Sequence, residues 1–307
     1  MYLRSLNPSL EVFTVRVLCG PSSVKLAENI GYEMRIPCVK AQFKRFPDGE
    51  FYFRLLEDVE GEDLLVVQSL YPPQDQHIVE LLYILETCRE LGAKRLIVYA
   101  PYLAYSRQDE RYLPGEAVSS KILAHLIQEA GASELYTVDI HNIKVLDYYR
   151  IPAYDLTAAE EIIRYFVSKG VENPLILAPD GEEDAIRRAE TAARAIGTDY
   201  DWLEKHRDRE TGKIVTVEKP LKASGRDVVI IDDIISTGGT AANAARILRK
   251  QGARRVYVGV THALLAEGAL ERLKAAGVEE VVGTDSIPGP VSKITTAPII
   301  ARKLKPT

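Results

Sequence analysis

The sequence VVIIDDIISTGGT, residues 228–240, decides the fold class. Its apolar start has the length of a strand and ends in two carboxylates, Asp232 and Asp233. Small residues follow and lead into residues 241–250, where Ala241, Ala244, Ala245 and Leu248 have the spacing of one helix face. A strand that passes through a short loop into a helix is the repeating unit of a parallel sheet. This stretch therefore predicts an α/β fold.

The loop at residues 236–240 has the chemistry of a site for a sugar phosphate. Gly238 and Gly239 let backbone N–H groups approach a phosphate closely, and the helix start adds a partial positive charge. Ser236, Thr237 and Thr240 add hydroxyl donors, while the preceding carboxylates can accept hydrogen bonds from a sugar diol. Two alternatives remain, a capped helix start and a magnesium site of another fold. A GxxxxGK[ST] phosphate loop is absent.

The rest of the chain repeats this alternation of strands and helices. Apolar strand segments are expected near residues 14–19, 63–69, 95–100 and 135–139, and again near 174–178, 227–231, 255–260 and 279–283. A length of 307 residues suits two domains. We expect them at residues 1–152 and 153–307, each with a mostly parallel sheet flanked by helices, and the last residues packing back on the first domain.

Composition excludes several classes of protein. The 39 basic and 44 acidic residues give a net charge of −5, which argues against sequence-independent nucleic-acid binding. No apolar run approaches the ~20 residues of a membrane span, and the N-terminal residues do not resemble a signal peptide. Three widely spaced cysteines argue against a disulfide framework or a zinc knuckle. We expect a cytoplasmic protein.

Two segments interrupt the alternation and predict hairpins. FPDGE at residues 46–50 is typical of a turn, and its aromatic and acidic side chains could also stack on a purine and accept its amino protons. KHR at residues 205–207 opens a basic excursion that ends near residue 218. It is either a solvated hairpin tip or an arm that folds over a bound triphosphate.

Candidate ligands also follow three predicted strands, at the sheet edge where α/β proteins bind ligands. Arg107 follows residues 95–100, Asp139 and His141 follow 135–139, and Asp180 follows 174–178. Magnesium prefers oxygen ligands, so chemistry alone favours Asp139 over His141 as its ligand. A solvated Arg107 and a structural His141 are the simpler interpretations.

Together these motifs resemble those of the ribose-phosphate diphosphokinases, or PRPP synthetases, which have a type I phosphoribosyltransferase-like fold. The resemblance runs from about Val15 to Pro298 and rests on FPDGE (46–50), YSRQD (105–109), VDIH (138–141), APD (178–180), KHR (205–207) and DDIISTGGT (232–240). It implies two tandem phosphoribosyltransferase-like domains. It also implies an enzyme of nucleotide biosynthesis that makes PRPP and AMP from ribose 5-phosphate and ATP, with Mg²⁺ as cofactor.

The resemblance also assigns roles to residues. It implies that Lys205 and Arg207 are catalytic and that His141 and Asp180 bind the metal. ATP is expected to contact Phe46, Asp48, Gly49, Glu50, Arg107, Gln108 and His141. Ribose 5-phosphate is expected to contact Arg207, Asp232, Asp233, Ser236, Thr237, Gly238, Gly239 and Thr240.

The sequence departs from the family pattern at two places. Glu110 stands where many members carry a basic residue, and Glu182-Glu183 stand where small residues are usual. The resemblance further implies a homo-oligomer with a nucleotide site near a subunit interface. Two other functions remain open, a nucleobase phosphoribosyltransferase that consumes PRPP and a non-catalytic regulatory homologue.

Overall fold

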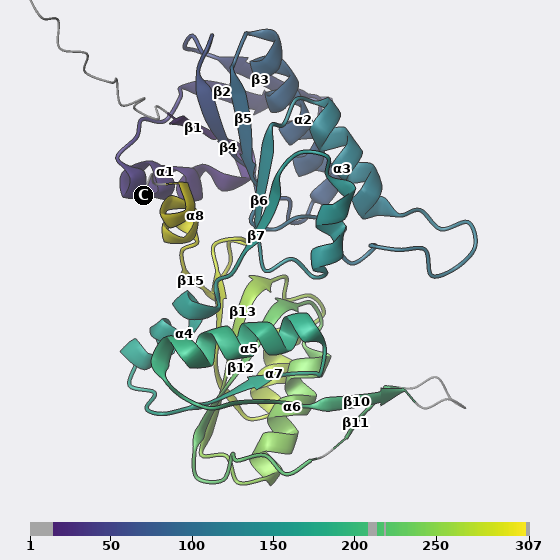
Figure 1. Ribbon diagram of the computed structural model, residues 1–307, viewed down its shortest axis with the longest axis vertical. Coiled ribbons are helices and arrows are strands. Elements are labelled where there is room, and N and C mark those ends of the chain that lie inside the picture. Colours follow the sequence, from purple (N-terminus) through teal and green to yellow (C-terminus); the bar gives the residue numbers. More distant parts are fainter. Residues whose placement is uncertain (1–14, 208–213, 218, 305–307) are drawn as a thin grey trace, which may run out of the picture.

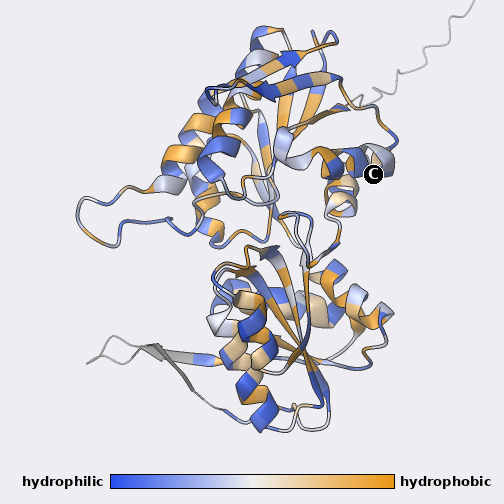
Figure 2. Cartoon of the chain, turned by 180° about the vertical axis from the view of Figure 1, so that it is seen from behind, coloured by the Kyte–Doolittle hydropathy of each residue, from blue (hydrophilic) through white to orange (hydrophobic). Residues whose placement is uncertain are grey.

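Two parallel sheets, each flanked by helices, make up the protein (Figure 1). The computed structural model describes residues 15–207, 214–217 and 219–304, and it describes only the backbone of residues 205–207 and 214–217. Figure 2 shows apolar residues along the strands inside both units and more polar residues on the outer helix surfaces. The predicted α/β class with mostly parallel sheets is confirmed.

The first sheet has five parallel strands in the order β1-β4-β5-β6-β7. They are β1 Val15–Cys19, β4 Asp63–Val67, β5 Arg95–Tyr99, β6 Glu134–Val138 and β7 Ala153–Leu156. Between them lie the helices η1 Pro21–Ser23, α1 Val24–Met34, α2 Gln74–Glu90, α3 Ser119–Glu129 and η2 Ile143–Tyr148. Successive side chains of a strand point to opposite faces, so Leu64 and Val66 pack with α2 and α3, whereas Leu65 and Val67 pack with α1.

The second sheet has six parallel strands in the order β15-β14-β13-β12-β8-β9. They are β8 Leu175–Ala178, β9 Tyr200–Trp202, β12 Asp227–Ile235, β13 Arg255–Ala263, β14 Val278–Thr284 and β15 Ser292–Ile294. Its helices are α4 Ala159–Ser168, α5 Glu183–Ile196, α6 Gly239–Lys250 and α7 Ala269–Ala275. The apolar start of β12 is fully buried between neighbours on both sides, as its sequence predicts.

Both expected hairpins are present. The antiparallel strands β2 Ala41–Arg45 and β3 Phe51–Leu55 flank the FPDGE turn, where the N–H of Phe46 donates to the carbonyl of Glu50 at 2.9 Å. Gly49 has a φ of +95°, a conformation that glycine adopts without strain. The strands β10 Glu204–Arg207 and β11 Ile214–Val217 form the second, antiparallel hairpin.

The chain crosses between the two sheets later than expected and then returns. Residues 153–156 form β7, which pairs with β6, so the first sheet extends past the expected boundary at residue 152. Its four residues contain no apolar run from which the sequence could predict a strand. At the other end of the chain, α8 Ala297–Leu304 leaves the second sheet and packs against α1 of the first unit (Figure 1).

Buried hydrogen bonds join the carboxyl edges of the two sheets. His262 at the end of β13 contacts the carbonyl oxygen of Val138 in β6, at 2.8 Å from its Nε2. The neighbouring Thr261 hydroxyl donates to Asp139 at 2.6 Å. None of the helices in the described part of the chain combines the length and apolar composition that a membrane span requires.

A close contact between β13 and α4 makes Gly259 a test of this packing. A Cβ at Gly259 would lie 2.2 Å from Cγ2 of Ile162, whereas a Cβ at Gly289 meets nothing within 4 Å. Overpacking of a core costs about 1–3 kcal/mol. We therefore expect Gly259→Ala to lower the free energy of unfolding by this amount in denaturant titrations, with Gly289→Ala close to wild type. Equal stability of the two variants would contradict this close packing.

A buried carboxylate at the start of β12 predicts a dependence of stability on pH. Burial alone would raise the pKa of Asp227, but hydrogen bonds from Arg254 and Arg255 outweigh it and lower the pKa to about 2. An unfolded aspartate has a pKa of about 3.9, so the stabilisation is complete above that pH and is lost as the pH falls through about 2. The two arginines are about half exposed, which weakens the pair.

We therefore expect Asp227→Asn to cost about 1–2 kcal/mol at pH 7 and little near pH 2, measured by chemical denaturation. The matched control is Asp199→Asn, because Asp199 pairs with Arg226 at 3.0 Å but its side chain is 61% exposed. A pH-independent loss in Asp227→Asn would show that the charge of Asp227 is not what stabilises this strand.

Candidate functional site

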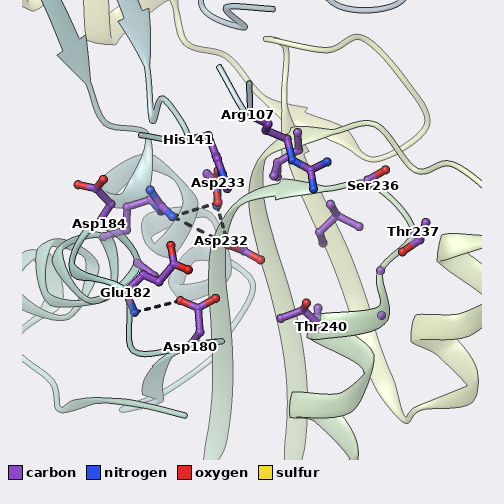
Figure 3. A pocket seen from close by; sticks show the side chains of 17 residues that line it. Arg107, His141, Asp180, Glu182, Asp184, Asp232, Asp233, Ser236, Thr237 and Thr240 are labelled. Atoms are coloured by element: carbon purple, nitrogen blue, oxygen red, sulfur yellow. Dashed lines mark hydrogen bonds and ion pairs between the residues drawn. The ribbon is translucent and has the colours of Figure 1, made fainter. Parts of the chain in front are cut away.

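The site lies where the strand order of the second sheet reverses. From β8 the chain continues outward to β9, whereas from β12 it continues the other way to β13, β14 and β15. Helices leave β8 and β12 on opposite sides of such a point, so a crevice opens at the carboxyl ends of these strands. A cavity of about 250 Å³ occupies this position (Figure 3). The side chains that line it and carry its chemistry are Arg107, His141, Asp180, Glu182, Asp184, Arg188, Asp232, Asp233, Ser236, Thr237 and Thr240.

The loop from Ser236 to Thr240 forms one wall of this cavity and passes into α6. Gly238 precedes the helix with a φ of +75°, and no side chain of the described residues caps its N-terminus. The first amide groups of α6 are therefore available to an anion, and the helix dipole favours negative charge there. The loop is held from behind, because the N–H of Ala266 donates to the carbonyl of Ser236 at 2.9 Å and Arg272 donates to that of Thr237.

The two carboxylates at the end of β12 have different surroundings. Oδ1 of Asp233 accepts a hydrogen bond from Nη2 of Arg188 at 3.0 Å, and its Oδ2 contacts Nδ1 of His141 at 2.9 Å. Asp232 lies 4.0 Å from the same arginine nitrogen and accepts the N–H of Asp233 at 3.0 Å. The sequence predicts that both acids face the ribose, but in the structure Asp233 already has a side-chain partner for each oxygen.

These contacts shift the pKa values of the site in opposite directions. Burial and the charge of Asp233 raise the pKa of Asp232 well above its usual value. Burial would also raise the pKa of Asp233, but the hydrogen bond from His141 and the charge of Arg188 outweigh it and lower that pKa. The hydrogen bond to Asp233 raises the pKa of His141. The site therefore favours an ionised Asp233 and holds less charge on Asp232.

Arg188 is a site residue that sequence reasoning missed. It lies on α5, and its side chain is 6% exposed. The sequence contains a signal that could have identified Arg188. Ala185, Ala189 and Ala192 form the buried face of this helix, and residue 188 lies on the same face. An arginine on a buried alanine face needs a carboxylate partner, and the acidic end of β12 supplies it.

The first sheet supplies Arg107 and His141 to the cavity from its own carboxyl edge. Arg107 lies in the loop after β5, and His141 follows β6. Gln108 is next to Arg107 but is not among the cavity residues, because its side chain accepts a hydrogen bond from Ser119 at the start of α3. Glu110 also lies outside the cavity lining and is exposed.

Acidic groups dominate the opposite wall. Asp180 follows β8 and, at 3.2 Å, accepts the N–H of Glu182, the residue directly before α5. Glu182 and Asp184 also line the cavity, so five carboxylates face two arginines there. Of the departure Glu182-Glu183, Glu182 directly precedes α5 and Glu183 stands in its first turn, where the helix dipole favours acidic residues.

The donor set fits a magnesium ion that a substrate helps to hold. The described residues contain no group of three or more His, Cys, Asp or Glu side chains placed to bind a metal. Mg²⁺ commonly takes one or two carboxylates and completes its shell with water and substrate phosphates. Among the described side chains of the cavity the acidic groups outnumber the arginines, so a cation shared with a phosphate would fit beside Asp180.

Two groups of expected site residues lie elsewhere or lack a described side chain. Phe46 at the β2–β3 hairpin is 39% exposed and has Nζ of Lys44 4.7 Å from its ring centre. Neither Phe46 nor Asp48, Gly49 and Glu50 line the cavity, and Asp48 instead accepts the N–H of Glu50 at 3.2 Å. The strand β10 places the backbone of Lys205 and Arg207, but their side chains lie outside the described part of the structure.

Two family models match the chain. Residues 15–131 match the N-terminal domain of ribose phosphate pyrophosphokinase, and residues 194–303 match the phosphoribosyl synthetase-associated domain. Among solved structures, phosphoribosylpyrophosphate synthetase from Mycobacterium smegmatis has a TM-score of 0.82 at 27% identity. The match covers 94% of this chain and 97% of that one.

Curated relatives are more similar in sequence. The ribose-phosphate pyrophosphokinase of Sulfolobus acidocaldarius is 44% identical over 270 residues, which cover 87% of this chain and 92% of that protein. The ribose-phosphate pyrophosphokinase of Methanothermobacter thermautotrophicus is 40% identical over 92% of this chain and 98% of its own length. With this identity over nearly the whole of both chains, the protein belongs to the ribose-phosphate pyrophosphokinase family.

Proposed function

We propose that this enzyme transfers the diphosphoryl group of ATP to the C1 hydroxyl of ribose 5-phosphate in a magnesium-dependent reaction. The C1 oxygen attacks the β-phosphorus and its hydroxyl proton is released to solvent. The bond from that phosphorus to the bridging oxygen breaks, its electron pair stays on the α-phosphate of AMP, and the products are PRPP, AMP and one proton. The observation that carries this proposal is the single cavity in which an uncapped helix start, acidic groups and two arginines meet at the edges of both sheets.

Ribose 5-phosphate binds on the side of the second sheet. The 5-phosphate accepts hydrogen bonds from the amides of the loop at residues 236–240, and the hydroxyls of Ser236, Thr237 and Thr240 add donors. Asp232, which lies in β12 four positions before this loop, accepts hydrogen bonds from the ribose diol. The spacing of the loop and the carboxylate along β12 supports this orientation, with C1 directed toward the first sheet.

ATP binds between the two sheets with its phosphates near Arg107. A planar guanidinium suits phosphate oxygens, and Arg107 reaches the cavity from the loop after β5. His141 and Asp180 would hold Mg²⁺ together with the phosphates, and the ion would neutralise charge on the transferred group. Five carboxylates in the cavity support this assignment, because without a cation they would repel a triphosphate.

The adenine contacts come from a second copy of the chain. Phe46, Asp48, Gly49 and Glu50 sit on the β2–β3 hairpin and do not reach the cavity of their own subunit. An exposed aromatic ring at the tip of a hairpin is suited to stack on a base in a neighbouring subunit. We therefore propose a homo-oligomer with its nucleotide site near a subunit interface. Gln108 is adjacent to Arg107 and contacts the same nucleotide.

Lys205 and Arg207 supply positive charge to the transferred group. Phosphoryl transfer depends mostly on positioning and electrostatic stabilisation, so two cations on one hairpin strand are a suitable catalytic device. The two residues are two positions apart in β10. Arg207 also contacts ribose 5-phosphate in this arrangement. The thiols of Cys19, Cys38 and Cys88 are free, which fits a reducing cytoplasm, where we place the enzyme.

The first test is product formation by the purified protein. With ATP, ribose 5-phosphate and Mg²⁺, we expect AMP and PRPP in equal amounts, and no AMP without ribose 5-phosphate. Lys205→Ala should lower turnover about 10²–10³-fold, the usual cost of removing one electrostatic donor. The control is Lys222→Ala, an exposed lysine outside the cavity. If Lys205→Ala retained turnover within about threefold, or ~0.7 kcal/mol, the catalytic role of the hairpin would be excluded.

The second test concerns the phosphate loop. A Cβ at Gly239 would meet only Oγ1 of Thr237, at 3.9 Å, so the folded protein tolerates Gly239→Ala. The methyl group would nevertheless stand where a phosphate must approach the amides. We expect ribose 5-phosphate to bind at least about tenfold more weakly by calorimetry, or ~1.4 kcal/mol, with an unchanged melting temperature. Gly289→Ala is the control, and unaltered affinity in Gly239→Ala would place the phosphate elsewhere.

A further inference from the structure

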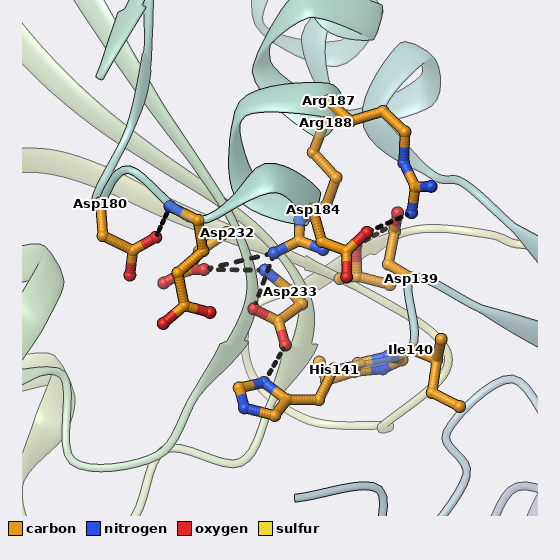
Figure 4. A network of polar contacts seen from close by, with 12 residues as sticks. Asp139, Ile140, His141, Asp180, Asp184, Arg187, Arg188, Asp232 and Asp233 are labelled. Carbon is orange, nitrogen blue, oxygen red and sulfur yellow. Dashed lines mark hydrogen bonds and ion pairs between the residues drawn. The ribbon is translucent and has the colours of Figure 1, made fainter. Parts of the chain in front are cut away.

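A chain of three side chains links the two units across the cavity. Arg188 on α5 donates to Oδ1 of Asp233 on β12, and Oδ2 of the same carboxylate contacts Nδ1 of His141, which follows β6 (Figure 4). The two contacts measure 3.0 Å and 2.9 Å, which are ordinary hydrogen-bond lengths. Asp233 thus connects a buried arginine of one unit to a histidine of the other through hydrogen bonds.

Burial separates the roles of the two neighbouring acids. The side chain of Asp233 is 7% exposed and that of Arg188 is 6% exposed, whereas His141 is 37% exposed at the cavity. Asp232 is 14% exposed, and Arg188, its cationic partner among the described side chains, is at the limit of ion-pair distance at 4.0 Å. A substrate hydroxyl can therefore approach Asp232, while the oxygens of Asp233 are directed at the protein.

We infer that Asp233 and Arg188 are positioning residues for His141, and that Asp232 alone of the acidic pair contacts the ribose. This inference rests on the proposed function and revises the role that the sequence suggests for Asp233. A carboxylate that accepts the Nδ1–H of a neutral imidazole fixes its tautomer and leaves the Nε2 lone pair directed elsewhere. Here Nε2 is the nitrogen left for a ligand in the cavity.

Arg188 contributes to this arrangement because its guanidinium compensates the charge of the Asp233 carboxylate. A buried carboxylate that faced only a neutral imidazole would be costly, so the guanidinium keeps Asp233 ionised and fixes one of its oxygens. The other oxygen then has a defined direction toward His141. Because His141 belongs to the other unit, the same contact also fixes the spacing between the two walls of the cavity.

Asp233→Asn gives a sharp test because the hydrogen bonds around an amide are directional. Arg188 can only donate, so the amide oxygen must face it, and the amide NH₂ must then face His141. That NH₂ donates to Nδ1, which moves the proton of the neutral imidazole to Nε2. Asp232→Asn is the matched control, since Nδ1 of His141 contacts Asp233 and not Asp232, so this change leaves the tautomer as it was.

The readout is the nitrogen spectrum of ¹⁵N-histidine-labelled protein without metal or substrate, at a pH where the imidazole is neutral. His141→Asn assigns the signal among the five histidines. We expect the Nδ1–H tautomer in wild type and Asp232→Asn, and the Nε2–H tautomer in Asp233→Asn. The wild-type spectrum alone can overturn the inference, because an Nε2–H tautomer there would exclude the proposed role whether or not any variant folds.

Binding measurements separate this inference from the proposed function. With a non-hydrolysable ATP analogue present, we expect Asp233→Asn to weaken Mn²⁺ binding about 10–100-fold while ribose 5-phosphate affinity stays within about threefold. Asp232→Asn should show the reverse pattern. A loss of ribose 5-phosphate affinity in Asp233→Asn as large as that in Asp232→Asn would overturn the assignment. A wild type with the Nδ1–H tautomer that bound no ribose 5-phosphate would refute only the proposed function.

Discussion

The buried hydrogen bonds between β6 and β13 are the constraint on which the site depends. His262 and Thr261 contact Val138 and Asp139, so the carboxyl edge of one sheet is fixed against that of the other. Buried polar groups are expensive to leave without partners, and these contacts therefore resist separation of the two edges. With the edges fixed in this way, residues such as Arg107 and Asp232 line one cavity, although they are 125 positions apart in the sequence.

The electrostatics of the cavity follow from the contact between the carboxyl edges of the two sheets. Strand ends and a helix start bring five carboxylates close together, and among the described side chains of the cavity two arginines, with an uncapped helix N-terminus, oppose them. Such a site binds phosphate groups well when a cation accompanies them. The mildly acidic composition of the whole chain is consistent with a protein that holds anions by local geometry and not by its overall field.

Sequence patterns predict the parts of this protein that are local. The apolar run and small-residue loop of residues 228–240 predict β12, its turn and α6, because the strand and helix periods change there. The hydrogen bonds that link Arg188, Asp233 and His141 join α5, β12 and the loop after β6. No local sequence pattern encodes how these three elements are placed relative to one another. The short strand β7 was missed for a related reason, since its pairing with β6 and not its composition makes it a strand.

The return of the chain to the first unit also affects how the two units can move. Because β1 begins on this unit and α8 ends on it, the second sheet and its helices form an insertion that is attached at both ends. A unit joined by one linker can swivel in many directions, whereas a unit joined at two crossings has fewer rotations open to it. Residues 157–158 and 295–296 form the two crossings, and Asp285 holds the second by accepting hydrogen bonds from the N–H and the hydroxyl of Thr296.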